Sequence, residues 1–212
     1  MSELGNLFNK YGCDKTKKHR YEKIYEPVFK KLKDKTDLRI LEIGVFNGHS
    51  TEALLDYFPH AHMYGIDIFE RTNPEDIEAY MDHDDRTHWL KANSTDPNLY
   101  KMLRDKFGKS TKFDIIIDDG MHTPKANKET FENLYRTLKK DGVYFIEDVW
   151  PLELMNDTEM EHHWIQRFPD RYNLMDNQLF LNSLERSGLR VLRHDHRKLT
   201  GHADSYIIEL RS

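Results

Sequence analysis

The sequence has very little cysteine and no long apolar run, and each scarcity excludes a class of protein. Cys13 is the single cysteine among 212 residues, so no internal disulfide can form, as is typical of proteins from a reducing compartment. No stretch approaches the roughly 20 apolar residues that a membrane span requires, and the N-terminus lacks the apolar core of a signal peptide. We therefore expect a cytoplasmic protein that contacts no membrane.

An excess of basic charge is also lacking. The chain carries 32 Lys and Arg against 37 Asp and Glu, for a formal net charge of -5, and the two signs are interspersed. Because no basic stripe is present to follow a phosphate backbone, a nucleic-acid partner is disfavoured. Internal repeats and Pro/Gly-rich linkers are missing too, and one hydrophobic core suits a chain of this length. We expect a single domain over residues 1–212, whose oligomeric state stays open.

What the sequence does contain is a regular alternation of apolar runs and amphipathic stretches. The apolar runs, which we interpret as strands, cover residues 38–43, 62–67, 87–92, 113–118 and 143–147. The helix-like stretches cover residues 50–57, 98–107 and 125–139. This order is typical of β-α-β units around a parallel sheet.

The two ends of the chain complete the predicted fold. Residues 1–35 indicate one or two helices that cap the ligand-binding edge, whereas residues 150–172 are irregular, aromatic and rich in histidine. A helix over residues 177–187 and strands at 189–193 and 205–210 follow. The fold class is therefore α/β and Rossmann-like, with a seven-stranded, mostly parallel sheet, an antiparallel edge strand and helices on both faces.

A glycine pair follows the first predicted strand and indicates a nucleoside site. Gly44 and Gly48 let the backbone approach a ligand, but the third glycine of the G-x-G-x-x-G dinucleotide motif is missing. Asp67 ends the second strand, where a carboxylate accepts hydrogen bonds from ribose hydroxyls. A phosphate-free adenosyl ligand therefore fits better than NAD, the alternative being two helix-capping glycines and a solvated acid. The candidate cofactor contacts are Tyr21, Glu42, Gly44, Asn47, Gly48, Ser50, Asp67, Ile68, Asn93 and Asp118.

Acidic residues gather at the ends of two further strands. Asp118 and Asp119 end the fourth predicted strand, and Glu147 and Asp148 end the fifth. Because neighbouring parallel strands present their carboxyl ends at one edge, these acids should converge and repel one another unless a cation joins them. Oxygen ligands favour a hard cation such as Mg²⁺ or Mn²⁺. The candidate metal ligands are Asp119, Asp148 and Glu147.

A histidine close to these acids suggests the chemistry of the site. His122 lies three residues after Asp119, and an imidazole there can remove a hydroxyl proton while the oxygen attacks the methyl group of a sulfonium donor. We therefore take His122 and Asp119 as the catalytic residues. The alternative is a purely structural role, in which the acids cap the helix beginning near Pro124 and His122 is an ordinary histidine.

Three stretches resemble the metal-dependent sugar O-methyltransferases of macrolide and rhamnosyl-antibiotic pathways, the mycinamicin/macrocin type. They are Gly12-Cys13-Asp14-Lys15 with His19, Tyr21 and Tyr25-Glu26, then residues 41–50, and last residues 117–122 together with 146–148. The resemblance covers residues 12–150. It implies a class I methyltransferase that uses S-adenosyl-L-methionine and a divalent cation and methylates a hydroxyl of a sugar or glycan.

The resemblance also implies roles for single residues. Asp119 and Asp148 would bind the metal, His122 would be the base, and Tyr21 would contact the methionine end of the cofactor. The third metal-binding carboxylate stays open between Glu147 and Asp118, and Met121 departs from the small residue usual in the family. The walls of the acceptor site would come from residues 150–176, where Trp164 and nearby aromatics offer stacking on a sugar ring.

Three other functions compete with this interpretation. A catechol or another small phenol offers the same vicinal oxygens to a metal as a sugar does. A nicotinamide-dependent oxidoreductase is disfavoured by the missing third glycine, and comparing the binding of NAD and S-adenosylhomocysteine tests it. A silent nucleoside-binding module would show no turnover with any acceptor.

Overall fold

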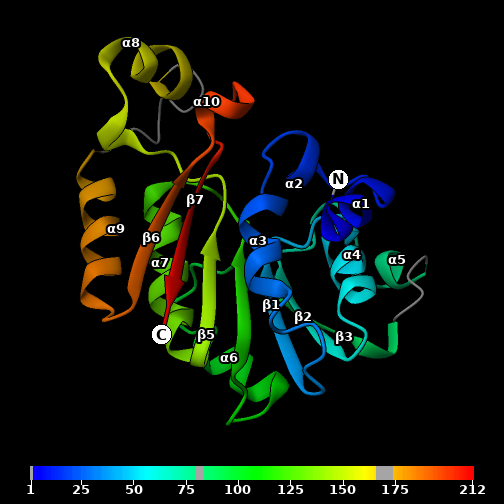
Figure 1. Ribbon diagram of the computed structural model, residues 1–212. Coiled ribbons are helices and arrows are strands. Elements are labelled where there is room, and N and C mark those ends of the chain that lie inside the picture. Colours follow the sequence, from blue (N-terminus) through cyan, green and yellow to red (C-terminus); the bar gives the residue numbers. More distant parts are fainter. Residues whose placement is uncertain (1, 80–83, 166–173) are drawn as a thin grey trace.

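The computed structural model describes residues 2–79, 84–165 and 174–212 and contains a seven-stranded sheet (Figure 1). Along the chain the strands are β1 Leu38–Ile43, β2 Ala61–Asp67, β3 Thr87–Lys91, β4 Phe113–Asp118, β5 Leu138–Ile146, β6 Arg190–Asp195 and β7 Tyr206–Arg211. In space their order is β3-β2-β1-β4-β5-β7-β6. The order reverses between β1 and β4, which is where ligands of open α/β sheets bind.

The sheet is mostly parallel. Strands β1 to β5 pair in parallel, whereas β7 is antiparallel to both of its neighbours, β5 and β6. The central strand β4 is buried along its whole length, as strands covered on both faces are. The α/β class, the mostly parallel sheet and the antiparallel pairing at one edge are confirmed.

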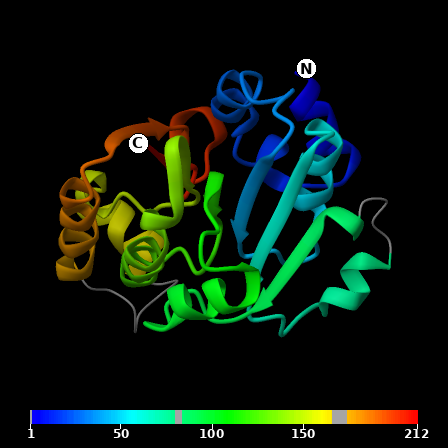
Figure 2. The same ribbon diagram turned by 90° about the horizontal axis from the view of Figure 1, so that it is seen from below.

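Helices cover both faces of the sheet (Figure 2). Helices α1 Glu3–Lys10, α3 Glu22–Phe29 and α4 His49–Tyr57 pack against one face, and α6 Leu99–Phe107, α7 Pro124–Leu134 and α9 Leu174–Arg186 pack against the other. The two cores are separate because strand side chains alternate: Ile115 and Ile117 belong to the first core and Ile116 to the second. The shorter helices are α2 Asp14–Lys17, α5 Pro74–Glu78, α8 Asp157–Glu159 and α10 Arg197–Thr200. No helix of the described residues is long and apolar enough to cross a membrane.

Several predicted boundaries were wrong. The helix expected over residues 177–187 begins at Leu174, and the stretch expected to be irregular contains short helical turns between Leu152 and Ile165. The helix expected over residues 125–139 ends at Leu134, and residues from Leu138 onward already belong to β5. The lysines after Leu138 lie in a strand because Leu138 pairs with Phe113, and the register shifts beyond that pair. Residues 1–35 contain three helices, α1 to α3, and not one or two.

A buried carboxylate joins three strands at the end of the sheet away from the glycine turn. Asp114 on β4 is only 3% exposed and accepts hydrogen bonds from the backbone N–H of Arg39, at 2.8 Å, and from the ammonium groups of Lys35 and Lys139, at 2.6 and 2.8 Å. Burial alone would raise the pKa of Asp114, but these donors outweigh it and lower the pKa below its ordinary value. The charged form of the Asp114 carboxylate therefore stabilises the folded state.

We expect Asp114→Asn to lower the free energy of unfolding by about 2 kcal/mol, because hydrogen bonds to a charged group are lost in a buried place. Since the folded pKa lies below the unfolded one, this contribution is complete above the unfolded pKa and is lost as the pH falls through the folded pKa. Urea denaturation at neutral pH measures it. The control is Asp105→Asn, which removes an exposed ion pair with Lys101 and should change stability by less than about 0.5 kcal/mol. Equal effects of the two substitutions would contradict this account.

Candidate functional site

Loops after four parallel strands meet at one end of the molecule, the upper end in Figure 1, where α2 also lies. In each of these loops a residue other than glycine adopts a left-handed backbone: Phe46 after β1, Phe69 after β2, His122 after β4 and Asp148 after β5, with φ between 49 and 57°. Such conformations cost about 1 to 2 kcal/mol each and persist where the surroundings enforce them. Their concentration at the strand ends marks this edge as the candidate site.

The glycine turn and the acidic loop are in direct backbone contact. Gly44 has a φ of +83°, and a Cβ atom placed on it would lie 2.1 Å from the carbonyl oxygen of Asp119. The two loops are held in register because the Asp119 N–H donates to the Ile43 carbonyl at 2.9 Å. Only glycine fits between them. The nucleoside motif and the acidic motif of the sequence thus lie side by side.

The acid and the serine that flank the glycine turn bind each other. Glu42 is fully buried and accepts hydrogen bonds from the hydroxyls of Ser50 and Thr51. Burial raises the pKa of Glu42 above its ordinary value. Its visible role is to connect β1 with α4, so for Glu42 and Ser50 the cofactor contact stays a prediction.

The remaining predicted contacts line the edge formed by β1, β2 and β3. Asp67 accepts hydrogen bonds from the backbone N–H groups of Phe46 and Phe69, at 3.1 and 2.7 Å, and stays partly exposed. Gly48, with a φ of 73°, begins α4. The other three are accessible: Asn47 accepts from the Thr72 hydroxyl at 2.8 Å, Asn93 accepts from Thr95, and Ile68 is 45% exposed. Their contact with a ribose and an adenine ring stays a prediction.

Asp119, His122 and Asp148 form a compact group of ligand atoms. One ligand atom of each residue lies within 4.8 Å of the others. Among the described residues, this is the one group of at least three His, Cys, Asp or Glu side chains that could hold a metal ion. His122 Nε2 lies 3.5 Å from Asp119 Oδ1, whereas His122 Nδ1 is buried without a hydrogen-bond partner. Two carboxylates and an imidazole at this spacing fit a divalent cation.

The other two acids of the sequence motif lie behind this group. Both carboxylate oxygens of Glu147 are hydrogen-bonded to the Lys15 ammonium, at 2.7 and 2.8 Å, and one also accepts from the Tyr25 hydroxyl. Asp118 is 2% exposed. The structure therefore places His122, rather than Glu147, beside Asp119 and Asp148. The metal role of Glu147 and the cofactor role of Asp118 stay predictions.

Residues of the N-terminal segment reach into the site, which the sequence analysis did not anticipate for Lys15. Its ammonium, only 2% exposed, lies 2.7 Å from Asp119 Oδ2. The Tyr21 hydroxyl donates to Asp148 Oδ1 at 2.7 Å, and His19 Nδ1 lies 3.4 Å from the same oxygen. The signal was present in the G-x-D-K and H-x-Y pattern, but nothing local in the sequence paired these residues with acids more than a hundred positions away.

The site carries more negative charge than its lysine neutralises. Burial would lower the pKa of Lys15, but Asp119 and Glu147 raise it well above its ordinary value. Conversely, burial would raise the pKa of Asp119, but Lys15 lowers it. Burial and the charge of Asp119 raise the pKa of Asp148 to about 8. A divalent cation beside Asp148 would favour the charged form of its carboxyl group.

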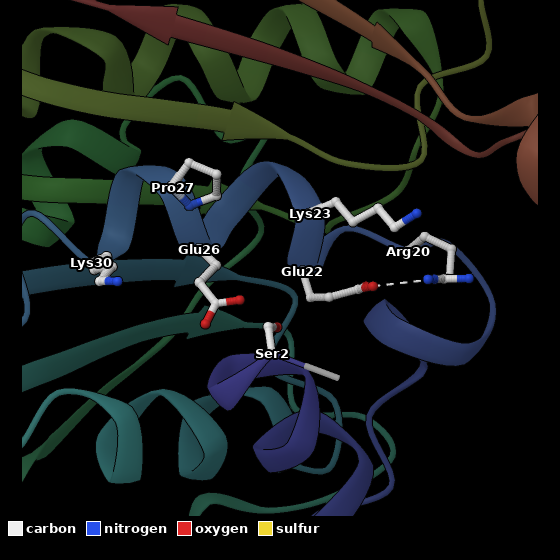
Figure 3. A pocket seen from close by; sticks show the side chains of 7 residues that line it. All are labelled: Ser2, Arg20, Glu22, Lys23, Glu26, Pro27 and Lys30. Carbon is white, nitrogen blue, oxygen red and sulfur yellow. Dashed lines mark hydrogen bonds and ion pairs between the residues drawn. The ribbon is translucent and has the colours of Figure 1, made fainter.

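An open groove lies outside this group (Figure 3). It has a volume of about 530 Å³ and is lined by Ser2, Arg20, Glu22, Lys23, Glu26, Pro27 and Lys30. Figure 3 shows Arg20 and Glu22 joined across its edge by an ion pair, at 3.1 Å. The lining has mixed charge and no metal-ligand cluster, so it does not compete with the acidic site. The acceptor walls were expected in residues 150–176, where Trp150 is buried and Leu154 is 51% exposed. The side chain of Trp164 and residues 166–173 lie outside the described part.

Comparison with known proteins adds relatives to this geometry. The model of a methyltransferase domain family matches residues 41–149, more than half of the chain. A curated relative from Streptomyces olivaceus, 8-demethyl-8-alpha-L-rhamnosyl tetracenomycin-C 2'-O-methyltransferase, is 30% identical over 159 residues, which are 70% of this chain and 39% of the relative. Mycinamicin VI 2''-O-methyltransferase from Micromonospora griseorubida is 26% identical over 139 residues, 62% of this chain and 32% of the relative.

A solved structure is similar over nearly the whole chain. It is the MycE methyltransferase from the mycinamycin biosynthetic pathway in complex with Mg, SAH and mycinamycin VI. The TM-score is 0.70 at 20% sequence identity, and the match covers 99% of this chain and 54% of MycE. At this identity the likeness establishes the fold. The chain thus spans about half of the MycE chain and 32 to 39% of the two curated relatives.

Proposed function

This chain belongs to the methyltransferase domain family, and we propose that it is an S-adenosylmethionine-dependent, metal-assisted O-methyltransferase whose acceptor is a hydroxyl of a sugar. The resemblance drawn from the sequence agrees with the relatives, which are named as O-methyltransferases of rhamnosyl and macrolide substrates. The observation that carries the proposal is the group of Asp119, His122 and Asp148 in backbone contact with the Gly44 turn.

Each residue has a task that its place in the site supports. Asp67 and the backbone of the Gly44 turn hold the adenosyl group. The Asp67 carboxylate accepts hydrogen bonds from the ribose hydroxyls. Asp119 and Asp148 would hold a divalent cation. A divalent cation at these residues would lower the pKa of an acceptor hydroxyl and fix its direction.

His122 provides the proton transfer. Its imidazole takes the proton of the acceptor hydroxyl while that oxygen bonds to the methyl carbon of the donor and the carbon–sulfur bond breaks. The products are the methyl ether, S-adenosylhomocysteine and a protonated imidazole, which returns its proton to water. His122 has a φ of 57°, and its Nε2 lies 3.5 Å from Asp119 Oδ1.

Calorimetry of S-adenosylmethionine binding, with and without Mg²⁺, tests donor and cation together. We expect saturable binding of S-adenosylmethionine and of Mg²⁺ and no binding of NAD, because the Gly44 turn lacks the third glycine for a pyrophosphate. Methyl transfer to a rhamnoside should stop when a chelator removes the cation. NAD binding in place of the sulfonium donor would overturn the proposal.

The acceptor class requires a separate comparison. Rhamnosides and catechols are offered to the same preparation with Mg²⁺ present, and methylation is followed by mass spectrometry. We expect transfer to the rhamnoside. Transfer to the catechol alone would keep the methyltransferase and replace the sugar by a phenol, and no transfer to any acceptor would favour a silent nucleoside-binding module.

A further inference from the structure

Tyr21 is attached to one of the proposed metal ligands by two hydrogen bonds. Its hydroxyl donates to Asp148 Oδ1 at 2.7 Å and accepts from the Asp148 backbone N–H at 3.2 Å. The same oxygen lies 3.3 Å from the Asp204 carbonyl. Tyr21 is fully buried, so its ring and hydroxyl are committed to partners within the protein.

Asp148 is a residue that requires such support. It follows the end of β5 with a φ of 49°, a left-handed conformation that L residues rarely adopt. A bond from one hydroxyl to both the backbone N–H and the carboxylate fixes the peptide and the side-chain torsion together. Without it, the carboxylate would keep the longer contact with His19 Nδ1, at 3.4 Å, and would be held less firmly toward Asp119 and His122.

We propose that Tyr21 is a positioning residue of the metal centre, which orients the Asp148 carboxylate toward the cation from a segment of the chain outside the sheet. This inference rests on the proposed function, since it needs the cation. It differs from the contact with the methionine end of the cofactor that the family resemblance implied for Tyr21, because a fully buried hydroxyl with three oxygen or nitrogen neighbours offers no free face to a ligand.

The surrounding ion pairs give the same segment a second hold on the centre. Lys15 lies 2.7 Å from Asp119 Oδ2, which leaves Oδ1 on the side of His122 at 3.5 Å. The hydroxyl of Tyr21 and the ammonium of Lys15 therefore each fix one ligand carboxylate. Groups that hold ligands in this way commonly change metal affinity by 10 to 100-fold when removed.

Tyr21→Phe in the full chain tests the proposal. The substitution removes one oxygen atom and keeps the buried ring. Replacing Lys15 instead would leave the buried Glu147 carboxylate without its ammonium partner. We expect the dissociation constant for Mn²⁺, measured by electron paramagnetic resonance of the free ion, to rise about 10-fold or more. The affinity for S-adenosylmethionine, measured by calorimetry, should stay unchanged. Raising the metal concentration should restore kcat, so that the defect appears in the apparent KM for the metal.

Tyr57→Phe is the matched control, because it also removes the hydroxyl of a buried tyrosine, from α4, whose acidic neighbours Glu3 and Glu26 do not belong to the proposed metal centre. Its Mn²⁺ affinity should equal that of the wild type, and a melting curve of each variant reports folding. Unchanged Mn²⁺ affinity in Tyr21→Phe, or a loss of cofactor affinity with metal affinity intact, would overturn the inference. A wild-type protein that binds no Mn²⁺ would instead refute the metal in the proposed function, which is a distinguishable result.

Discussion

Replacement of His122 by alanine should lower the rate of methyl transfer by about 10² to 10⁴-fold, the range that a positioned acid or base contributes. The acceptor oxygen would then have to lose its proton to water. The affinity for S-adenosylmethionine should stay unchanged because His122 lies in the loop after β4, and the predicted adenosyl contacts lie mainly at β1 and β2. Single-turnover kinetics with saturating donor and Mg²⁺ measure the effect on the chemical step.

His60→Ala provides the control for this experiment. His60 is an exposed histidine in the turn before β2, so its loss should leave the rate unaltered. Normal transfer by His122→Ala would remove the base from the mechanism. A loss of Mn²⁺ affinity in that variant would reassign His122 from base to metal ligand, which its membership of the group with Asp119 and Asp148 also allows.

The second large effect is expected at Gly44. Gly44→Ala places a Cβ atom 2.1 Å from the Asp119 carbonyl oxygen, so the glycine turn and the acidic loop must move apart. Backbone strain at a φ of +83° adds to this clash. We expect a loss of about 3 kcal/mol in the free energy of unfolding, together with weaker binding of both S-adenosylmethionine and Mn²⁺. Urea denaturation and calorimetry measure these changes.

Gly188→Ala separates strain from contact. Gly188 has a φ of +76°, but nothing lies within 4 Å of a Cβ placed on it. Its replacement should therefore cost only the strain of a left-handed alanine, about 1 kcal/mol, and leave both ligands bound as in the wild type. If the two alanine variants lose the same stability and Gly44→Ala still binds both ligands, the close approach of the loops has no functional weight.

The part of the site that sequence reasoning reached follows from strand direction. Gly44, Asp67, Asp119 and Asp148 each come at or just after the end of a parallel strand, and parallel strands end at one edge, so their approach could be predicted without coordinates. His122 followed because it lies three residues from Asp119. The hydrophobic runs also predicted the central strands β1 and β4, since buried parallel strands are apolar throughout.

The sequence could not indicate contacts between the strand ends and residues outside the sheet. Lys15 and Tyr21 lie in a segment whose local pattern indicates helices, and their bonds to Asp119 and Asp148 join residues 104 and 127 positions apart. The start of β5 was missed for a related reason: Leu138 to Asp141 is polar enough to continue a helix, and only pairing with Phe113 makes it a strand. At the start of β5, tertiary pairing overrides the local preference for helix.

The strand order has a consequence for how the protein folds. Strand β7 is made after β6 but lies between β6 and β5, so β6 has no place in the sheet until β7 has paired. During synthesis β5 therefore keeps an open hydrogen-bonding edge while β6 and α10 are being added, and contacts between distant segments form late. Such an edge is exposed to pairing with other nascent chains, so the pairing of β7 with β5 also covers a surface that is open to aggregation.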